Sequence, residues 1–220
     1  MADKHLSKQE IREDHFIDWL LEASEYVRAR SQVFIAGAMG LVVLIAAITY
    51  YNKSQGDSRL EAAALLGEAM IADDNNQGDE ATRMAEQLLK EHAGTPAAAQ
   101  GTLFLANHYY AQGRYGEAQK LYERYLSDYE QVDVLAFAAR NGLASCAEAQ
   151  GDYRQAAAKF QEAATADGGN TEGILALLEA ARCYGLAGDA ANQKSILTQI
   201  TKDHADSPAA TRAREELAML

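Results

Sequence analysis

The chain repeats a nine-residue phrase, and the spacing of its copies constrains the fold more than any other feature of the sequence. Residues 90–98 read KEHAGTPAA and residues 202–210 read KDHADSPAA, 112 positions apart. Between them, QGRYGEA begins at 112, QGDYRQA begins 38 residues later, and AGDAANQ follows after another 37. Three such periods span the 112 positions. A fixed period in this range predicts stacked repeats, each of which needs its neighbours to bury its apolar face.

The pattern after the first quarter of the chain is helical throughout, with short breaks and no strand signal. Pairs of glycine with Asp or Arg mark the breaks, because glycine tolerates the left-handed backbone that ends a helix. The pairs are Gly78-Asp79, Gly113-Arg114, Gly151-Asp152 and Gly188-Asp189. Pro96 and Pro208 each follow a Thr or Ser cap. The predicted helices are 57–73, 79–92, 96–112, 115–129, 132–150, 153–166, 171–187, 190–204 and 208–219.

A different signal precedes the repeats. Residues 31–52 carry no charge, and the 19 residues from Val33 to Tyr51 form an apolar helix about 28 Å long, close to the thickness of a bilayer core. A buried core helix rarely stays uncharged on every face, and a cleaved signal peptide needs a short basic start, whereas seven acidic residues precede this segment. We interpret it as an uncleaved transmembrane anchor.

The charges beside this segment predict its orientation. Five basic residues precede the span and two closely follow it, which favours a cytoplasmic N-terminus. We therefore divide the chain into a cytoplasmic amphipathic segment (1–30), a transmembrane helix (31–52), a polar hinge (53–58) and a repeat domain (59–220). The first segment either lies at the interface or against a partner helix, or simply continues into the span. Within the span, small residues suggest a helix–helix contact in the membrane, at Ala36, Gly37 and Gly40.

Charge and motif content exclude several functions. The formal net charge is −12, and 14 basic against 25 acidic side chains from residue 54 onward give −11, which argues against binding nucleic acid. Cys146 and Cys183 lie 37 residues apart, in one slot of neighbouring repeats, too far apart for a disulfide. No metal-ligand cluster, cofactor motif or catalytic motif occurs, so we expect no metal, no cofactor and no enzymatic activity.

Residues 105–126, LANHYYAQGRYGEAQKLYERYL, resemble the tetratricopeptide repeat. The large, small and aromatic positions of its first helix match Leu105, Ala106 and Tyr109, and those of the turn and second helix match Gly113, Tyr115, Ala118 and Tyr122. Tyr125 departs from the pattern, because that position is normally small. A second copy has Leu143, Ala144, Gly151, Tyr153, Ala156, Phe160 and Ala163. The resemblance implies an all-α fold, in which one transmembrane helix precedes an α-solenoid of about four helix pairs and a C-terminal capping helix.

The resemblance also implies a binding surface on the concave side of the solenoid, which we call the inner wall. Its residues would be Gln100, Leu103, Asn107, Tyr110, Asn141, Ser145, Glu148, Leu175, Leu178 and Arg182. This mixture suits an extended apolar peptide or a helix. The alternative is that the wall is merely solvated, or covered by the final helix.

The order of tail, span and repeats is similar to the bacterial ancillary Sec-translocon subunit family. That resemblance implies a single-pass protein of the bacterial inner membrane with a periplasmic repeat domain. Its partners would be proteins: the translocon, chaperones or other subunits of a membrane complex. The expected function is a membrane-anchored protein-protein interaction module, a scaffold that holds periplasmic or translocating proteins near an inner-membrane complex. The alternative is a permanent structural subunit of a larger membrane-protein assembly.

Overall fold

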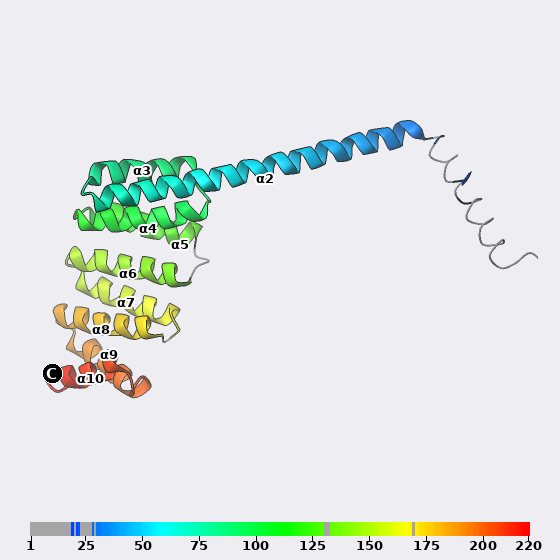
Figure 1. Cartoon of the computed structure of the whole chain (residues 1–220). Helices are drawn as coiled ribbons and strands as arrows, with labels where there is room; N and C mark the ends of the chain where they lie inside the picture. The colour runs from blue at the N-terminus through cyan, green and yellow to red at the C-terminus, as the bar shows by residue number, and fades with distance from the viewer. Residues whose placement is uncertain (1–18, 20, 23–27, 29, 130–132, 169) are drawn as a thin grey trace, which may run out of the picture. The chain divides into compact units, whose positions relative to one another are not determined.

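The described part of the chain is entirely helical. The computed structural model describes residues 19, 21–22, 28, 30–129, 133–168 and 170–220. Within these ranges there are no strands, and the helices follow one another through short connections (Figure 1). They are α2 (Ser31–Asp74), α3 (Gly78–Glu91), α4 (Pro96–Ala111), α5 (Tyr115–Asp128), α6 (Asp133–Ala149), α7 (Tyr153–Ala166), α8 (Thr171–Leu186), α9 (Ala190–Asp203) and α10 (Pro208–Leu217). Most of the predicted segment 1–30 lies outside the described residues.

Helix α2 belongs to both of the compact units into which the chain divides, residues 1–56 and 57–220. The polar segment 53–58, which we expected to form a hinge, is helical throughout. It contains no proline and only one glycine, and a single helical glycine costs about 1 kcal/mol relative to alanine, too little to end a long helix. The unit boundary nevertheless falls inside this segment, between Gly56 and Asp57.

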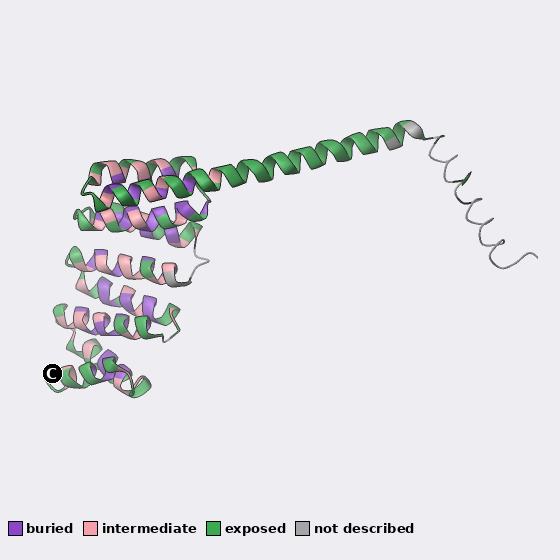
Figure 2. Ribbon diagram, viewed as in Figure 1, coloured by how far each residue is buried: buried purple, intermediate pink, exposed green. Residues whose placement is uncertain are grey.

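The second unit is a stack of helix pairs whose order in space follows the chain (Figure 1). Its buried residues lie between consecutive helices (Figure 2), and they form two clusters. Helix α6 contributes to both: Ala139 and Leu143 belong to the first cluster, and Ala144 and Ala147 belong to the second. Because successive helices share core residues in this way, the stack has the repeat architecture that the 37- to 38-residue period predicts.

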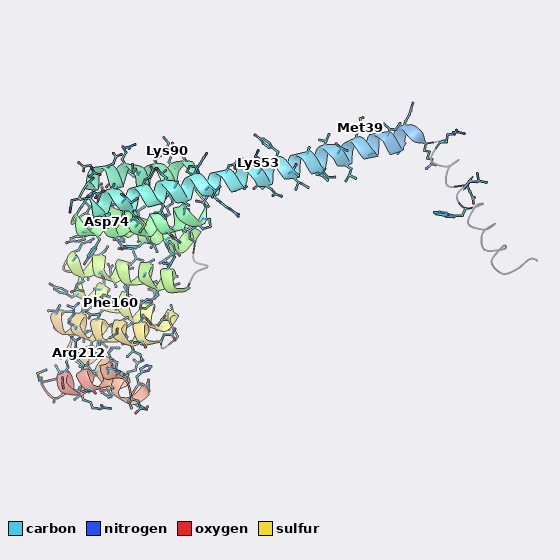
Figure 3. All side chains as sticks on the ribbon, in the orientation of Figure 1. Met39, Lys53, Asp74, Lys90, Phe160 and Arg212 are labelled. Atoms are coloured by element: carbon cyan, nitrogen blue, oxygen red, sulfur yellow. The ribbon has the colours of Figure 1, made fainter. Side chains whose placement is uncertain are left out.

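Small residues allow close packing between the helices of the stack. Ala106 and Ala144, which match the small position of the repeat, are fully buried, and so is Ala181 of α8. The large aromatic residues Tyr109, Tyr122 and Phe160 are buried as well, and Figure 3 shows Phe160 within the stack. Two helical glycines permit still closer contacts. A Cβ at Gly101 would lie 2.6 Å from Leu88 Cδ2, and a Cβ at Gly142 would overlap the Tyr122 ring.

The helix breaks at Gly113, Gly151 and Gly188 are closed by one backbone motif. At the end of α4, Arg114 N–H donates to the Tyr109 carbonyl and Gly113 N–H donates to the Tyr110 carbonyl, both at 2.9 Å, with Gly113 at φ 76°. This is the Schellman arrangement, which needs a left-handed residue after the helix. The predicted break at Gly78-Asp79 is different. Asn76 takes the left-handed conformation there, with φ 59°, and Gly78 is already the first residue of α3.

The repeated nine-residue phrase forms the same connection at both of its sites. The Thr95 hydroxyl donates to the His92 carbonyl at 2.8 Å and accepts from Ala98 N–H at 3.1 Å. Ser207 repeats this between α9 and α10, donating to the His204 carbonyl at 2.7 Å and accepting a backbone N–H at 3.2 Å. One hydroxyl thus satisfies both the end of one helix and the start of the next.

The C-terminal part of α2 is the first helix of the first repeat. Its buried residues Ala62, Leu66 and Ala69 belong to the same cluster as Leu88 of α3 and Ala98 of α4. Two histidines add polar links. Ser58 Oγ lies 3.0 Å from His92 Nδ1, and Asp73 Oδ1 lies 3.0 Å from His108 Nδ1.

Candidate functional site

The inner wall comes from the first helix of successive pairs. Helix α4 carries its first four predicted residues, from Gln100 to Tyr110. Helix α6 carries the next three, from Asn141 to Glu148, and α8 carries the last three, from Leu175 to Arg182. Tyr110 of α4 lies close to Glu148 of α6, and Glu148 accepts a hydrogen bond from Arg182 of α8. The structure therefore brings part of the predicted set together.

The α4 part of the wall is a rigid polar and aromatic surface. Tyr122 of α5 donates its hydroxyl hydrogen bond to Asn107 Oδ1 at 2.6 Å. Tyr110 is half-buried and packs against Tyr115, with ring centroids 5.3 Å apart. Burial raises the pKa of the Tyr110 hydroxyl, and the nearby Tyr115, Cys146 and Glu148 raise it further. Tyr110 therefore offers a ring edge and a neutral hydroxyl, close to the α6 part of the wall.

An ion-pair network joins α6 to α8. Arg182 donates from Nη2 to Glu148 and from Nε to Glu179, each at 2.7 Å. The hydrogen bond to Glu148 raises the pKa of the guanidinium, although its partial burial acts in the opposite direction. Arg182 is the one cation among the ten predicted wall residues. Because two carboxylates already neutralise it, it is not a ready site for a peptide carboxylate.

Two predicted wall residues are core residues instead. Leu103 is 6% exposed and packs in the first cluster, and Leu178 is 4% exposed and packs in the second. Their side chains point between helices, so they support the wall without presenting surface. Leu175, one turn earlier on α8, is 52% exposed and is the accessible apolar residue of that helix face.

The structure adds a hollow that sequence reasoning missed. It has a volume of about 410 Å³, it is mainly apolar, and it lies between α2 and α4. The missed residues are on α2, because the first repeat, around Leu60 to His92, keeps only Gly78, Ala85 and Leu89 of the repeat pattern. The apolar spacing of Ala63, Leu66 and Met70 was the available signal. The hollow is lined by Arg59, Ala63, Leu66, Gly67, Met70, Pro96, Ala97 and Gln100.

A second hollow of about 330 Å³ adjoins the first and shares Pro96 and Gln100 with it. Tyr125, the residue that departs from the repeat pattern, is fully buried and lines it. The Tyr125 hydroxyl and Asn141 Oδ1 are buried without a hydrogen-bond partner in the described part of the chain. Gln100, predicted for the wall, therefore lies between two apolar hollows near the start of α4.

The described residues offer little for catalysis or metal binding. They contain no cluster of three or more His, Cys, Asp or Glu side chains placed to hold a metal ion. Cys146 and Cys183 are both buried, free thiols, and burial raises the pKa of each to about 11. A protonated, buried thiol is a poor nucleophile.

The first part of α2 is long and apolar enough to cross a membrane, judged by length and composition. None of its most apolar 18-residue window is buried. Side chains project from all sides of this part, from Met39 to Lys53 (Figure 3). A Cβ at Gly37 or Gly40 would meet nothing within 4 Å in the described part of the chain, so the helix–helix contact predicted there, with Ala36, stays a prediction.

Comparison with known proteins identifies the family. The sequence profile of the Tetratricopeptide repeat-like domain family matches residues 25–168, more than half of the chain. The chain belongs to this family. The matched range of this tetratricopeptide repeat-like protein includes the uncharged stretch of α2 as well as the first repeats. No curated protein matches the chain.

Two solved structures agree with the repeat fold. A putative kinesin light chain of Podosopora anserina with nearly identical TPR-like repeats superposes with a TM-score of 0.56 at 22% sequence identity. The alignment covers 74% of this chain and 85% of that chain. A substituted form of the same kinesin light chain gives the same TM-score and identity, with 84% of that chain covered. YrrB, a TPR protein described as having an unusual peptide-binding site, gives a TM-score of 0.32 at 16% identity, covering 74% of this chain and 97% of that chain.

Proposed function

We propose that the protein is a membrane-anchored interaction module, with its N-terminus in the cytoplasm and its repeat stack in the periplasm. The observation that carries this proposal is the continuity of α2. One helix begins as an uncharged, fully exposed apolar segment and ends as the first helix of a tetratricopeptide stack. An apolar surface of that size needs a nonaqueous environment, because large exposed apolar patches in soluble proteins mark interaction or membrane sites.

Protease access in cells tests the orientation. The excess of basic residues before the span supports a periplasmic repeat domain. Protease added to intact spheroplasts should digest residues 57–220, and a cytoplasmic marker protein should stay intact in the same sample. If the repeat domain is protected until the membrane is lysed, the orientation is wrong.

The repeat stack would hold periplasmic or translocating proteins near an inner-membrane complex. Leu175 and Arg182 lie seven positions apart on α8, which places them on one helix face, and Arg182 is paired with Glu148. Together with half-buried Tyr110, they would give the inner wall the mixed character that suits a peptide or a helix. The net charge of −11 from residue 54 onward favours neutral or basic segments over acidic ones.

A matched pair of leucines tests the wall. Leu175 and Leu186 lie on the same helix with nearly equal exposure, 52% and 53%, but only Leu175 belongs to the predicted wall. Leu175→Asp should lower the recovery of partners cross-linked to the full-length protein in membranes, whereas Leu186→Asp should not. Equal recovery from both variants would show that partners bind elsewhere.

Partner behaviour separates the adaptor from the alternative, a permanent structural subunit. The architecture is similar to that of the ancillary Sec-translocon subunit family, so the translocon and its chaperones are the first partners to test. Co-purification in mild detergent should recover several weakly held proteins if the chain is an adaptor. One stoichiometric partner that survives high salt would instead identify a structural subunit.

A further inference from the structure

The two ends of the repeat stack have different surfaces. At the C-terminal end, α10 buries Ala209, Ala210 and Ala213 against the stack. Its outward residues, Thr211, Arg212, Arg214 and Glu215, are exposed and polar. Repeat proteins need such a polar outer face on their terminal helices to stay soluble. At the N-terminal end, α3 has exposed polar residues, whereas the outward face of α2 carries exposed apolar ones.

The outward face of α2 is an apolar stripe at helical spacing. Leu60, Ala64, Gly67 and Ile71 recur at intervals of four, three and four residues, which places them on one face, opposite buried Ala62, Leu66 and Ala69. Leu60 is 73% exposed and Ile71 is 61% exposed. Elsewhere in the stack, each first helix has a preceding helix pair to cover it, whereas α2 has none among the described residues. The stripe therefore has the pattern of a helix-packing face without its partner helix.

Gly67 lies at the centre of the stripe. A Cβ there would meet nothing within 4 Å, whereas a Cβ at Gly101 or Gly142 would overlap a neighbouring side chain. Gly116 has equally open surroundings, so the open space at Gly67 does not by itself indicate a partner. It does leave room for a second helix to approach the stripe closely.

The charges beside the stripe indicate which helix that is. Asp57, Glu61 and Glu68 lie along one edge, and Arg59, the sole basic residue of 57–74, lies along the other. None of the four forms an ion pair or side-chain hydrogen bond with any described residue. When two identical helices pack in parallel, the left edge of one faces the right edge of the other, whereas antiparallel packing brings like edges together. Parallel packing of two copies thus sets Arg59 of each against the acidic edge of the other.

We propose that the protein forms a parallel homodimer through the outward face of α2, with Gly67 at the closest approach and Leu60 and Ile71 as its apolar anchors. A twofold pair covers both stripes with one self-complementary contact.

The mass of the full-length protein in mild detergent, measured by light scattering during gel filtration, tests the dimer. The wild-type protein should have twice the mass of one chain after subtraction of the detergent. Ile71→Asp and Gly67→Leu should each weaken the dimer by at least about tenfold, the change expected from the loss of one interface anchor. Leu186→Asp, an equivalent change at an exposed leucine of α8, should leave the mass unchanged. A monomeric wild-type protein would overturn the proposal.

Two further sets of variants distinguish this face from the span, and parallel from antiparallel packing. The span could also pair through its small residues, so Gly40→Leu is measured beside Ile71→Asp. If Gly40→Leu alone gives a monomer, the span and not this face holds the dimer, and the proposal is wrong.

Charge reversal tests the direction of packing. Arg59→Glu should weaken the dimer. Addition of both Asp57→Arg and Glu61→Arg to the Arg59→Glu variant should restore the dimer, because the charges of the two edges are then exchanged. No restoration would refute parallel packing.

Discussion

Replacement of Gly142 by alanine should destabilise the repeat domain, although alanine is the better helix former. A Cβ at position 142 would lie 2.5 Å from Tyr122 Cε1 and 2.6 Å from Cε2, and still closer to Cζ. The ring cannot easily move away, because it is buried and its hydroxyl is hydrogen-bonded to Asn107 at 2.6 Å. Overpacking of this kind costs about 1–3 kcal/mol, and glycine to alanine in a helix returns at most about 1 kcal/mol. We expect a net loss of about 1 kcal/mol, the middle of the range of about 0–2 kcal/mol that these two terms leave.

A matched substitution isolates the contact. Gly116 is also helical, in α5, but a Cβ there would meet nothing within 4 Å. Gly116→Ala should therefore stabilise the domain by up to about 1 kcal/mol. Urea unfolding of the full-length protein in mild detergent, followed by far-ultraviolet circular dichroism, measures both changes. The same chemical substitution should thus have opposite effects at the two positions.

A double variant shows whether the Tyr122 ring causes the loss. Tyr122→Leu alone should destabilise the domain, but Gly142→Ala added to it should cost much less than in the wild-type background, because the ring is gone. A neutral or stabilising effect of Gly142→Ala, like the one expected of Gly116→Ala, would refute the overpacking of Tyr122. Simple addition of the effects of Tyr122→Leu and Gly142→Ala would refute it as well.

Two further predictions concern the helix connections and the buried titratable groups. Thr95→Ala should destabilise the domain by about 0.5–2 kcal/mol, because the Thr95 hydroxyl bonds to the ends of two helices. Ser207→Ala should cost less, since Ser207 connects only the last helix, α10, to the stack. Urea unfolding measures both changes. Stability should fall as the pH rises from about 9 to 12, because the fold holds Cys146 and Cys183 at a pKa of about 11 and Tyr109 at about 12, above the ordinary values of 9 and 10. The unfolded chain loses these protons first, so urea midpoints should decrease over this range, and less so in Tyr109→Phe.

The helix connections of the stack were predictable because they depend on nearby residues. Gly113 and Gly151 take the left-handed conformation that their sequence pairs predict, and Thr95 and Ser207 cap the helices that follow them. Residues within about five positions determine each of these features, so a single sequence contains the information. The prediction for Gly78 is wrong because asparagine also tolerates the left-handed conformation, and Asn76 precedes it.

The inner wall was harder to predict, because its properties depend on distant residues. Arg182 is neutralised by Glu148, which lies 34 residues away, and only the stacking of α6 against α8 brings them together. Leu103 and Leu178 lie at the edge of the predicted wall, where a small rotation of a helix decides between core and surface. The period of the repeat locates these residues on the right helices, but it cannot determine that rotation.

The first repeat shows most directly why sequence similarity and structure diverge in this chain. Its first helix continues from the apolar segment, so no break marks where the repeat begins, and no preceding helix pair among the described residues restricts its outer face. Residues that recur in the inner repeats to pack against such a pair are therefore not required on the outer face of α2, which explains the weak match of this copy.

An outer face that packs against nothing would be expected to carry polar residues, as the outer face of α10 does. Leu60 and Ile71 are nevertheless apolar and exposed. An apolar face that no described residue covers has the pattern expected of the proposed dimer interface.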